Sequence, residues 1–229
     1  MLDYSKILHH KYDALWRRLV SQNYSFAKNN SHYTSKFAYK EVIEFKNYVS
    51  RGSKKLKTVL DIGTGNARHA IVFAQDNFHV YANDISQHAI EFSKYHSALC
   101  GAKISFLCSD ILETTYDNNF FDIVLDCGCF HHLRQSQWKK YLSIIKNIII
   151  KDGYMFLLVF SDKTGVINKF GKKQGKYHNW SINNHHYYHY FSKEDIGKIF
   201  ANDFKVLKCY DIRKDDSQIY FKIVYMQKK

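Results

Sequence analysis

A glycine turn between a short β-rich run and a helix-like segment constrains the fold of this chain more than any other feature. The run Thr58–Ile62 leads directly into Gly63-Thr64-Gly65, and Ala67–Gln75 then has the composition of a helix. Glycines let a backbone turn sharply and let a ligand approach closely. Such turns also occur for purely structural reasons. The two glycines therefore indicate a ligand site only together with the segments around them.

Strand-like and helix-like segments alternate from residue 58 to residue 160. Beyond the first pair, the predicted strands are Phe78–Ala82, Lys103–Cys108, Phe121–Asp126 and Gly153–Phe160, and the predicted helices are Gln135–Ile149 and a segment capped by Ser86 that runs to about Leu99. Strands that alternate with helices imply a parallel sheet with helices on both faces. The nearly continuous apolar run of the last of these strands fits a strand that is covered on both faces.

The C-terminal part predicts a short helix and two closing strands. Ser192 is a suitable N-cap for a helix that ends at Phe200, and Phe204–Tyr210 and Gln218–Met226 have strand composition. Between the two parts, Ser161–Tyr190 shows no clear periodicity. The whole pattern predicts an α/β fold, Rossmann-like and doubly wound, with a mostly parallel sheet of seven strands, an antiparallel last strand and helices on both faces.

The composition limits the class of protein. The 229 residues suit one α/β domain with appended elements, and no run approaches the roughly 20 apolar residues that span a bilayer. The N-terminus lacks the apolar core of a secretory signal, and five irregularly spaced Cys predict reduced thiols rather than a disulfide framework. We therefore expect a soluble, cytoplasmic protein without membrane contact, either a monomer or a homodimer.

Carboxylates lie near the ends of successive predicted strands. Asp61 lies two residues before the first glycine, Asp84 comes at the end of the second strand, and Asp110 follows the third. Ligands of such sheets bind at the carboxyl ends of the strands. Asp84 lies 19 residues past Gly65, about the spacing at which a carboxylate reaches a ribose hydroxyl. A dinucleotide site would need a third glycine where Arg68 stands, and a carboxylate beside the glycines suits a cationic ligand better than a diphosphate.

With these residues, the stretch from 58 to 160 resembles the class I S-adenosylmethionine-dependent methyltransferases. The resemblance implies that the cofactor is S-adenosylmethionine and that it is bound by the turns after four strands. The implied cofactor-binding residues are Asp61, Gly63 and Gly65 for the methionine part, Asp84 for the ribose, Ile85, Asp110 and Ile111 for the adenine, and Asp126 with Cys127 and Gly128 for the sulfonium and the acceptor.

Several acceptor classes need residues that this chain lacks. Amino-directed DNA and RNA methyltransferases use an (Asn/Asp)-Pro-Pro-aromatic turn after the fourth strand, and cytosine-C5 enzymes use a Pro-Cys nucleophile, whereas this chain contains no proline. Protein arginine methyltransferases place two Glu in this loop and catechol enzymes need clustered carboxylates there, and Asp126–His132 offers neither. The remaining resemblance is to the small-molecule branch, similar to the tellurite-resistance and thiopurine methyltransferases.

In that branch, the loop after the fourth strand, an N-terminal helix and a late insertion enclose the acceptor. The resemblance therefore implies a helical cap formed by residues 1–57 over the active site, a methyltransferase domain formed by residues 58–229, and a lid insertion at about 161–190. The residues implied to bind the substrate are Tyr12, Trp16, Tyr33, His131, His185 and Tyr187. The expected acceptor is a small molecule that is methylated on O, N or S.

Two groups of histidines are candidates for chemistry. His131 and His132 follow the fourth strand, where a general base would lie beside the transferred methyl group. With Asp126 they form the predicted catalytic set, and capping of the next helix is the structural alternative. His185 and His189 have the spacing of a metal pair on a helix, but the glutamate that such a motif needs is missing. We therefore expect no metal. This second group of histidines belongs either to an aromatic lid over the acceptor or to an exposed surface without a function.

The formal net charge of +13 leaves the partner open, because the surplus of basic residues lies outside residues 58–160. A solvated, Lys-rich surface explains this surplus as well as an anionic acceptor or a nucleic acid does. An RNA-modifying methyltransferase that uses the basic N-terminal region is therefore an alternative, although no separate RNA-binding module is recognisable. Two further alternatives are a non-catalytic cofactor-binding subunit and non-methyl chemistry, such as cyclisation of the aminobutyrate chain of the cofactor.

Overall fold

The computed structural model describes residues 4–21, 35, 37–52, 56–164, 173–174, 179–183, 186–214 and 218–229. The chain divides into two compact units, Met1–Tyr116 with Phe121–Val124, and Asp117–Phe120 with Leu125–Lys229. The division falls within strand β4 (Phe121–Cys127), which contributes its first four residues to one unit and its last three to the other.

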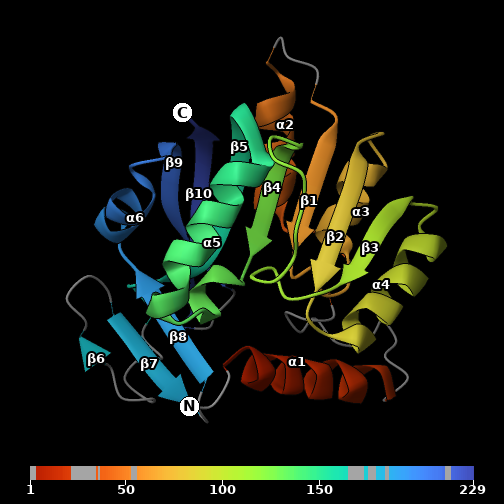
Figure 1. The fold of residues 1–229 in the computed structure, drawn as a ribbon, viewed down its shortest axis with the longest axis horizontal. Coiled ribbons are helices and arrows are strands. Elements are labelled where there is room, and N and C mark those ends of the chain that lie inside the picture. The colour runs from red at the N-terminus through yellow and green to blue at the C-terminus, as the bar shows by residue number, and fades with distance from the viewer. Residues whose placement is uncertain are drawn as a thin grey trace. The chain divides into compact units, whose positions relative to one another are not determined.

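The first unit is built on parallel strands whose ends meet at one edge (Figure 1). The strands are β1 (Thr58–Ile62), β2 (His79–Asp84) and β3 (Ile104–Cys108), and they follow the order β3-β2-β1-β4. Ile62 lies opposite Asn83, and Asp84 lies opposite Cys108. The segments that follow these three strands therefore leave the sheet at the same edge, which is where open α/β sheets bind ligands.

The helices described in this unit are α1 (Tyr4–Ser21), α2 (Lys40–Ser50), α3 (Arg68–Ala74) and α4 (Gln87–Leu99). Helix α4 begins where predicted, because the Ser86 side chain accepts a hydrogen bond from the Ala89 N–H at 3.2 Å. Helix α2 is held against α3 by Lys46, whose Nζ donates to the Val72 carbonyl at 3.1 Å and pairs with Asp76.

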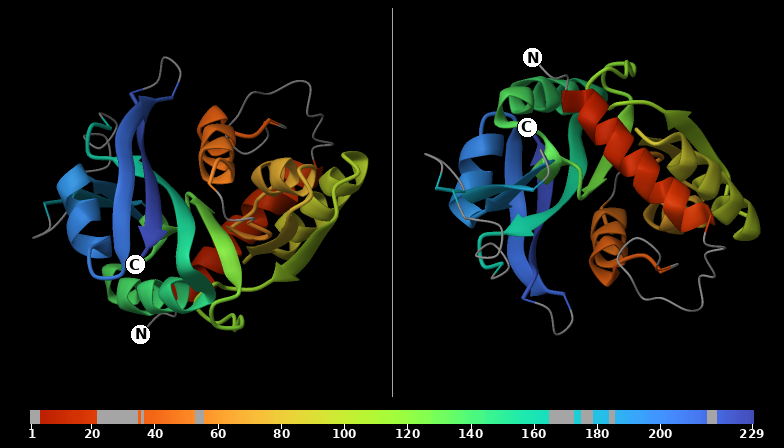
Figure 2. Two further views of the ribbon diagram at one scale, coloured as in Figure 1. Left: turned by 90° about the horizontal axis from the view of Figure 1, so that it is seen from above. Right: turned by 90° about the horizontal axis from the view of Figure 1, so that it is seen from below.

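Helix α1 crosses the end of the first unit beside α4, as the view from below in Figure 2 shows. The Trp16 ring lies 5.9 Å from the Phe92 ring of α4, centroid to centroid. This contact packs the two helices against each other.

The second unit contains a long strand, β5 (Ile149–Ser161), with partners of both directions. Strand β10 (Tyr220–Lys228) is antiparallel to β5 and to β9 (Phe204–Arg213), whereas β8 (His186–Phe191) is parallel to the end of β5. Strands β7 (Asn179–Asn183) and β6 (Lys173–Gln174) extend the sheet beyond β8 by antiparallel pairing. The helices are α5 (Gln135–Ile148), α6 (Lys193–Phe200) and the three-residue 3-10 helix η1 (Phe130–His132).

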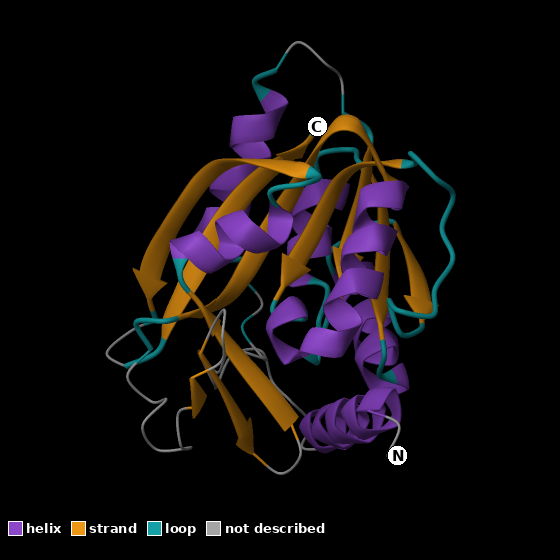
Figure 3. Ribbon diagram, turned by 60° about the vertical axis from the view of Figure 1, so that its left-hand side comes forward, coloured by secondary structure: helices purple, strands orange, loops and turns teal. Residues whose placement is uncertain are grey.

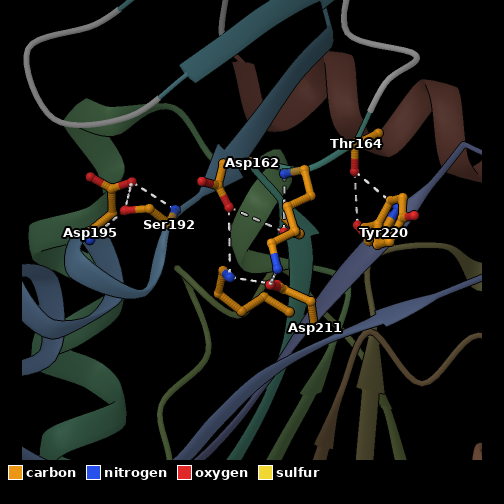
Figure 4. A network of polar contacts seen from close by, with 9 residues as sticks. Asp162, Thr164, Ser192, Asp195, Asp211 and Tyr220 are labelled. Atoms are coloured by element: carbon orange, nitrogen blue, oxygen red, sulfur yellow. Dashed lines mark hydrogen bonds and ion pairs between the residues drawn. The ribbon is translucent and has the colours of Figure 1, made fainter.

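The segment that runs from the end of β5 to the end of β8 begins and finishes at neighbouring residues. The Asp162 N–H donates to the Phe191 carbonyl at 3.1 Å. Around this closure, the buried Lys222 of β10 donates to Asp211 at 2.5 Å and lies 3.7 Å from the Asp162 carboxylate (Figure 4). The Thr164 hydroxyl donates to the Tyr220 carbonyl at 2.9 Å and accepts from the Tyr220 N–H at 3.1 Å. The next residue after Phe191 is Ser192, which caps α6 as predicted. Its hydroxyl accepts from the Asp195 N–H, and its own N–H donates to the Asp195 carboxylate.

The predicted α/β fold is confirmed: a mostly parallel sheet is flanked by helices (Figure 3), and its last strand is antiparallel to its neighbours. In the part of the chain that the structure describes, the sheet has ten strands rather than the seven expected. The additional strands β6, β7 and β8 come from the stretch Ser161–Tyr190, where side chains of His, Asn and Tyr replace the apolar residues that make alternation visible.

The remaining fold-level expectations concern the cap, the lid and the membrane. Residues 1–57 contain α1 and α2, and residues 161–190 contain β6, β7 and part of β8, while their roles as cap and lid stay predictions. Within the described parts of the chain, no helix has both the length and the apolar character that crossing a membrane requires.

Candidate functional site

The glycine turn follows β1 in the first unit and alternates between left-handed and ordinary backbone. Gly63, Gly65 and Ala67 have φ angles of 62°, 60° and 60°. The Thr64 N–H donates to the Asn83 carbonyl at 2.9 Å, which ties the turn to the end of β2. A left-handed conformation costs a residue with a Cβ about 1–2 kcal/mol. The turn is therefore a shape that two glycines permit and that Ala67 adopts under strain.

Asp61 and Asp84 both contact this turn. The Thr64 hydroxyl donates to Asp61 Oδ2 at 2.7 Å, and the Gly65 N–H donates to Asp84 Oδ2 at 2.9 Å. Asp84 Oδ1 accepts a second bond from the Ser86 N–H at 2.9 Å, so that this carboxylate joins the turn to the start of α4. Burial raises the pKa of Asp84 to about 6, although its backbone hydrogen bonds oppose the shift. Two carboxylates that the sequence separates thus meet at one glycine turn.

Helix α1 adds two side chains to this region. A Cβ placed on Gly65 would lie 3.0 Å from Cζ2 of Trp16, so that the indole rests directly against the turn. Asp13 accepts from the Ser86 hydroxyl at 2.9 Å and lies 2.8 Å from His88 Nδ1. Burial by itself would raise the pKa of Asp13, but the hydrogen bonds from His88 and Ser86 hold it at about 2. Asp13 was not predicted from the sequence, and its position one helical turn before Trp16 is the only signal that points to it.

The turn after β3 supplies the third predicted carboxylate. Asp110 Oδ1 accepts from the Leu112 N–H at 2.9 Å, and the neighbouring Ile111 is buried. The Ser109 N–H donates to the Asp84 carbonyl at 2.9 Å, which holds this turn beside the end of β2. Ile85 is half-buried in the first unit. The predicted cofactor residues of the first three strand ends are therefore close together.

Asp126 closes the turn after β4 in the second unit. Its Oδ1 accepts from the N–H groups of Gly128 and Cys129 at 3.1 and 2.7 Å, and its Oδ2 accepts from the Phe130 N–H at 3.1 Å and the Tyr141 hydroxyl at 2.6 Å. The residue is fully buried, and burial raises its pKa against the effect of these hydrogen bonds. Both oxygens thus bind the protein's own donors, which favours a role in holding the turn.

The two adjacent histidines lie on η1 and contact each other. The Nε2 atoms of His131 and His132 are 2.9 Å apart, and His132 Nδ1 lies 3.0 Å from the Tyr187 carbonyl of β8. The His131 ring lies 4.2 Å from the Phe160 ring, and the His132 ring lies 5.2 Å from the Tyr188 ring, measured between centroids. Both histidines are buried. Tyr187, a predicted substrate residue, therefore contacts the histidine pair through its backbone.

The remaining predicted site residues make few described contacts or lie outside the described residues. Tyr12 lies half-buried on α1, and Cys127 lies half-buried at the end of β4, while Tyr33 and His185 lie outside the described residues. His189 belongs to strand β8, so that the helical spacing noted for His185 and His189 does not describe its backbone. Among the residues that the structure describes, no group of three or more His, Cys, Asp or Glu gathers to hold a metal ion.

The donors and acceptors of the glycine turn suit a cationic adenosyl ligand. The turn contributes the carboxylates of Asp61 and Asp84. Arg68, the nearest cation in the sequence, is instead buried with its guanidinium 4.6 Å above the Tyr39 ring and its Nε 3.2 Å from His69 Nε2. A diphosphate would need positive charge at this turn, whereas a sulfonium with an amino group finds negative charge.

Comparison with known proteins agrees with this geometry. Residues 59–153 match the model of a family described as "Methyltransferase domain". An uncharacterised methyltransferase of Schizosaccharomyces pombe is 30% identical over 106 residues, which are 46% of this chain and 73% of that protein. The release factor glutamine methyltransferase of Bacillus anthracis is 32% identical over 98 residues, 42% of this chain and 34% of that protein.

A solved structure has the same fold over nearly the whole chain. It is the 1,6-didemethyltoxoflavin-N1-methyltransferase of Burkholderia thailandensis with bound 1,6-didemethyltoxoflavin and S-adenosylhomocysteine, with a TM-score of 0.71, 19% identity, and coverage of 96% of this chain and 90% of that one. Carboxylates at adjacent strand ends, a glycine turn and these relatives lead to one conclusion. The chain belongs to the class I S-adenosylmethionine-dependent methyltransferases and uses S-adenosylmethionine as its cofactor.

Proposed function

We propose that this methyltransferase transfers the methyl group to an oxygen, nitrogen or sulfur atom of a small molecule. The observation that carries the proposal is the position of Phe130, the aromatic residue of the turn after β4. Its ring is fully buried and lies within 5.6 Å, centroid to centroid, of the rings of Trp138, Tyr141, Phe191 and Phe200. A side chain packed in this way cannot stack on a nucleobase that has been turned out of a nucleic acid. The acceptor bound by the Burkholderia thailandensis relative is itself a small molecule.

In this proposal the cofactor is bound by the strand ends of the first unit. Asp84 takes the ribose hydroxyls, Asp61 and the glycine turn take the methionine part, and Asp110 with Ile111 and Ile85 takes the adenine. The cofactor supplies a methyl carbon that the sulfonium activates for in-line displacement. The protein's own contribution is therefore mainly to position the acceptor and to exclude water.

The assignment of cofactor residues is tested by calorimetric titration with S-adenosylmethionine. We expect Asp84→Ala and Gly63→Val each to weaken binding at least 100-fold, because one removes the acceptor for ribose hydroxyls and the other places a branched side chain at φ 62° beside the ligand. Asp117→Ala and Gly52→Val make the same changes at exposed positions and should leave affinity unchanged. Unchanged affinity in both site variants would overturn the assignment.

The acceptor class is tested by the release of S-adenosylhomocysteine. A panel of small thiols, amines, phenols and carboxylates is compared with bulk RNA and with a protein acceptor mixture at equal enzyme concentration. We expect turnover with at least one small molecule and none with RNA. RNA turnover together with a steep fall of RNA binding as salt rises would instead favour the RNA-modifying alternative.

A further inference from the structure

Helix α1 contacts both of the segments that hold Asp84. One segment is the glycine turn, whose Gly65 N–H donates to Asp84 Oδ2 at 2.9 Å, and the Trp16 indole lies against Gly65 itself. The other segment is the start of α4, where the Ser86 N–H donates to Asp84 Oδ1 at 2.9 Å and the Ser86 hydroxyl donates to Asp13 Oδ1 at 2.9 Å. Two side chains that lie one helical turn apart on α1 therefore reach the two segments that bind one carboxylate.

Ser86 connects α1 to Asp84. It is fully buried, and its hydroxyl accepts from the Ala89 N–H at 3.2 Å. A hydroxyl has one hydrogen to donate, and Asp13 accepts it. A change at Asp13 therefore acts on the residue whose own N–H donates to Asp84.

Asp13 also supplies negative charge to the start of α4. Its Oδ1 accepts from the His88 N–H at 3.4 Å and lies 2.8 Å from His88 Nδ1. The first turn of α4 contains no acidic side chain of its own. Because the N-terminus of a helix favours a nearby negative charge, α1 provides from another part of the chain what the sequence of α4 lacks.

The docking of α1 depends on a small number of side chains. Three of its 18 residues are buried, namely Tyr4, Leu8 and Trp16. The side chains of Asp13 and His88 remain 24% and 32% exposed, so that their contact alone contributes little. A helix of this length is only marginally stable by itself in water. The position of α1 therefore responds to changes at the few places where it contacts the rest of the unit.

We propose that Asp13 and Trp16 are positioning residues of the cofactor site, which act on the cofactor through the two segments that bind Asp84. Coupling between two sites is reciprocal, so that bound cofactor also holds α1 more firmly. The inference rests on the proposed function in one respect, the binding of the ribose by Asp84. Trp16, predicted from the sequence to bind the substrate, thereby has a role at the cofactor turn.

The physical reason is that the carboxylate is oriented before the ligand arrives. The N–H groups of Gly65 and Ser86 hold one oxygen each and fix the plane of the Asp84 carboxylate. Its remaining lone pairs then accept ribose hydroxyls without further ordering. If α1 releases either segment, part of the binding free energy is used to restore this orientation. Affinity therefore falls although no residue in contact with the ligand has changed.

The reciprocal effect is tested by amide hydrogen exchange on the full chain, with and without saturating S-adenosylhomocysteine. We expect exchange of the α1 amides to slow at least tenfold, and exchange of the α2 amides, in the same unit, to change less than threefold. Unchanged exchange in α1 would show that the two sites are not coupled. Faster exchange would show that α1 covers the turn in place of the ligand. Either result overturns the proposal.

The role of Asp13 is tested by calorimetric titration with S-adenosylhomocysteine at pH 8. Asp13→Ala removes the acceptor of the Ser86 hydroxyl, whereas Asp13→Asn keeps an oxygen in its place. We expect Asp13→Ala to weaken binding about tenfold and Asp13→Asn to weaken it less than threefold. Asp117→Ala and Asp117→Asn make the same changes at an exposed position and serve as controls. Equal losses in the two Asp13 variants, or none, would contradict the positioning role.

Action through Asp84 is tested by combining the two variants. If Asp13 acts only by orienting Asp84, its loss has no further consequence once Asp84 is gone. We expect Asp13→Ala to weaken binding less than twofold in the Asp84→Ala background. A further tenfold loss would mean that Asp13 reaches the cofactor by another route.

The pH dependence of binding distinguishes positioning from general support of the fold. Burial is the main cause that raises the pKa of Asp84, and the negative charge of Asp13 raises it further. Asp13→Asn removes this charge, so that Asp84 should ionise at lower pH. The ratio of Kd at pH 5 to Kd at pH 8 should therefore be smaller in the variant than in the unaltered protein. An unchanged ratio would contradict the proposal.

Other groups near Asp84 are controlled for in the same titration. Besides Asp13, the charged and titratable groups on the elements packed around Asp84 include Asp61 on β1, Arg68 on α3, His88 and Glu91 on α4, and Cys108 on β3. Imidazoles titrate near neutral pH, so that His88→Gln is measured in parallel. We expect the loss of binding on the acid side to persist in this variant, and its disappearance would count against the proposal.

The contact of Trp16 with the glycine turn is tested by two replacements. Trp16→Ala uncovers Gly65 and should weaken binding of S-adenosylhomocysteine about tenfold, whereas Trp16→Phe keeps a ring there and should weaken it less than threefold. Val20→Ala, at an exposed position of the same helix, is the control. Unchanged binding in Trp16→Ala would contradict the role of this side chain.

The possible failures are distinguishable. Binding of S-adenosylhomocysteine needs no acceptor, so that the acceptor panel and these titrations fail independently. If Asp84→Ala leaves affinity unchanged, the ribose assignment fails and this inference fails with it. If Asp84→Ala weakens binding but the Asp13 and Trp16 variants do not, the ribose assignment stands and α1 is only a neighbour of the site.

Discussion

Asp84 and Asp126 are both buried carboxylates at the ends of strands, yet they have different surroundings. Asp84 accepts the N–H groups of two separate segments, the glycine turn and the start of α4. Asp126 accepts three N–H groups of its own turn and the hydroxyl of Tyr141. The first carboxylate joins two loops at a sheet edge, and the second is enclosed by the turn that it stabilises.

This difference teaches that position at a strand end does not by itself make a carboxylate a ligand group. Asp126 was predicted to be catalytic because the family resemblance implies that the residue at the end of the fourth strand faces the sulfonium and the acceptor. Its oxygens are occupied by donors within a few residues and by Tyr141, a residue of the following helix. The comparison therefore predicts that loss of Asp126 harms the fold and that loss of Asp84 harms binding.

The largest expected effect is on the stability of the second unit. Asp126→Ala leaves buried N–H groups and the Tyr141 hydroxyl without their acceptor, so that the free energy of unfolding should fall by about 4 kcal/mol. Asp84→Ala should lower it by only about 1 kcal/mol, because two N–H groups lose their acceptor rather than three N–H groups and a hydroxyl, and one of the two belongs to the half-buried Gly65. Urea unfolding followed by circular dichroism measures both values at pH 8, and equal losses would remove the distinction drawn between the two carboxylates.

A smaller loss is expected when the hydroxyl of Tyr141 alone is removed. Tyr141→Phe keeps the buried ring but takes away a 2.6 Å bond to Asp126 Oδ2, so that the free energy of unfolding should fall by about 2 kcal/mol. The same measurement on Tyr95→Phe, at an exposed ring of α4, gives the baseline. The double variant Tyr141→Phe with Asp126→Ala should lose less free energy of unfolding than the sum of the two single losses, because the two groups bind each other.

The pH dependence of cofactor binding tests the other carboxylate. In the proposed function, ribose hydroxyls donate to an ionised Asp84, whose pKa burial raises to about 6. Binding should therefore be strongest above pH 6, and Kd should rise about tenfold for each pH unit below it. Asp13, with a pKa of about 2, stays ionised throughout this range. Calorimetry from pH 5 to pH 8 gives the slope, and a flat profile would show that the carboxylate does not contact the cofactor.

The smallest expected effect is at Ala67, the third left-handed residue of the glycine turn. Ala67→Gly removes the strain of a Cβ at φ 60° and should raise the free energy of unfolding by up to about 1 kcal/mol. Gly128→Ala makes the reverse change at φ 115° in the turn of Asp126 and should lower it. Thermal unfolding of both variants compares the two turns directly, and a destabilised Ala67→Gly would contradict the account of strain.

The sequence predicts those parts of the molecule that depend on local pattern. The apolar runs placed β1, β4 and β5 to within a few residues, and Ser86 and Ser192 cap the helices that they were expected to cap. The spacing between Gly65 and Asp84 was interpreted as that of a ribose-binding carboxylate, which stays a prediction. The hydrogen bond between the two residues arises because a short strand–helix–strand unit returns the chain to the adjacent strand.

Contacts between distant segments were not predictable from one sequence. Asp13 meets His88 across 75 positions, and nothing local to α1 indicates that partner. The contact of His132 with the Tyr187 carbonyl depends on β8, a strand hidden in a stretch of His and Tyr without visible alternation. Asp126 was assigned a role from its position, whereas its environment depends on Tyr141, which only the folded helix α5 brings near.

The hydrogen bond between Asp162 and Phe191 marks a place where the segment between these two residues can be replaced. The chain leaves β5 at Asp162 and ends β8 at Phe191, directly beside it, and Lys222 of β10 with its carboxylate partners stabilises this junction. Because the cost of closing a loop grows only slowly with its length, a segment of another size or composition can be inserted here without altering the strands on either side. If residues 161–190 form the predicted lid over the acceptor, transplanting this segment between relatives should change the acceptor while the rest of the chain keeps its fold.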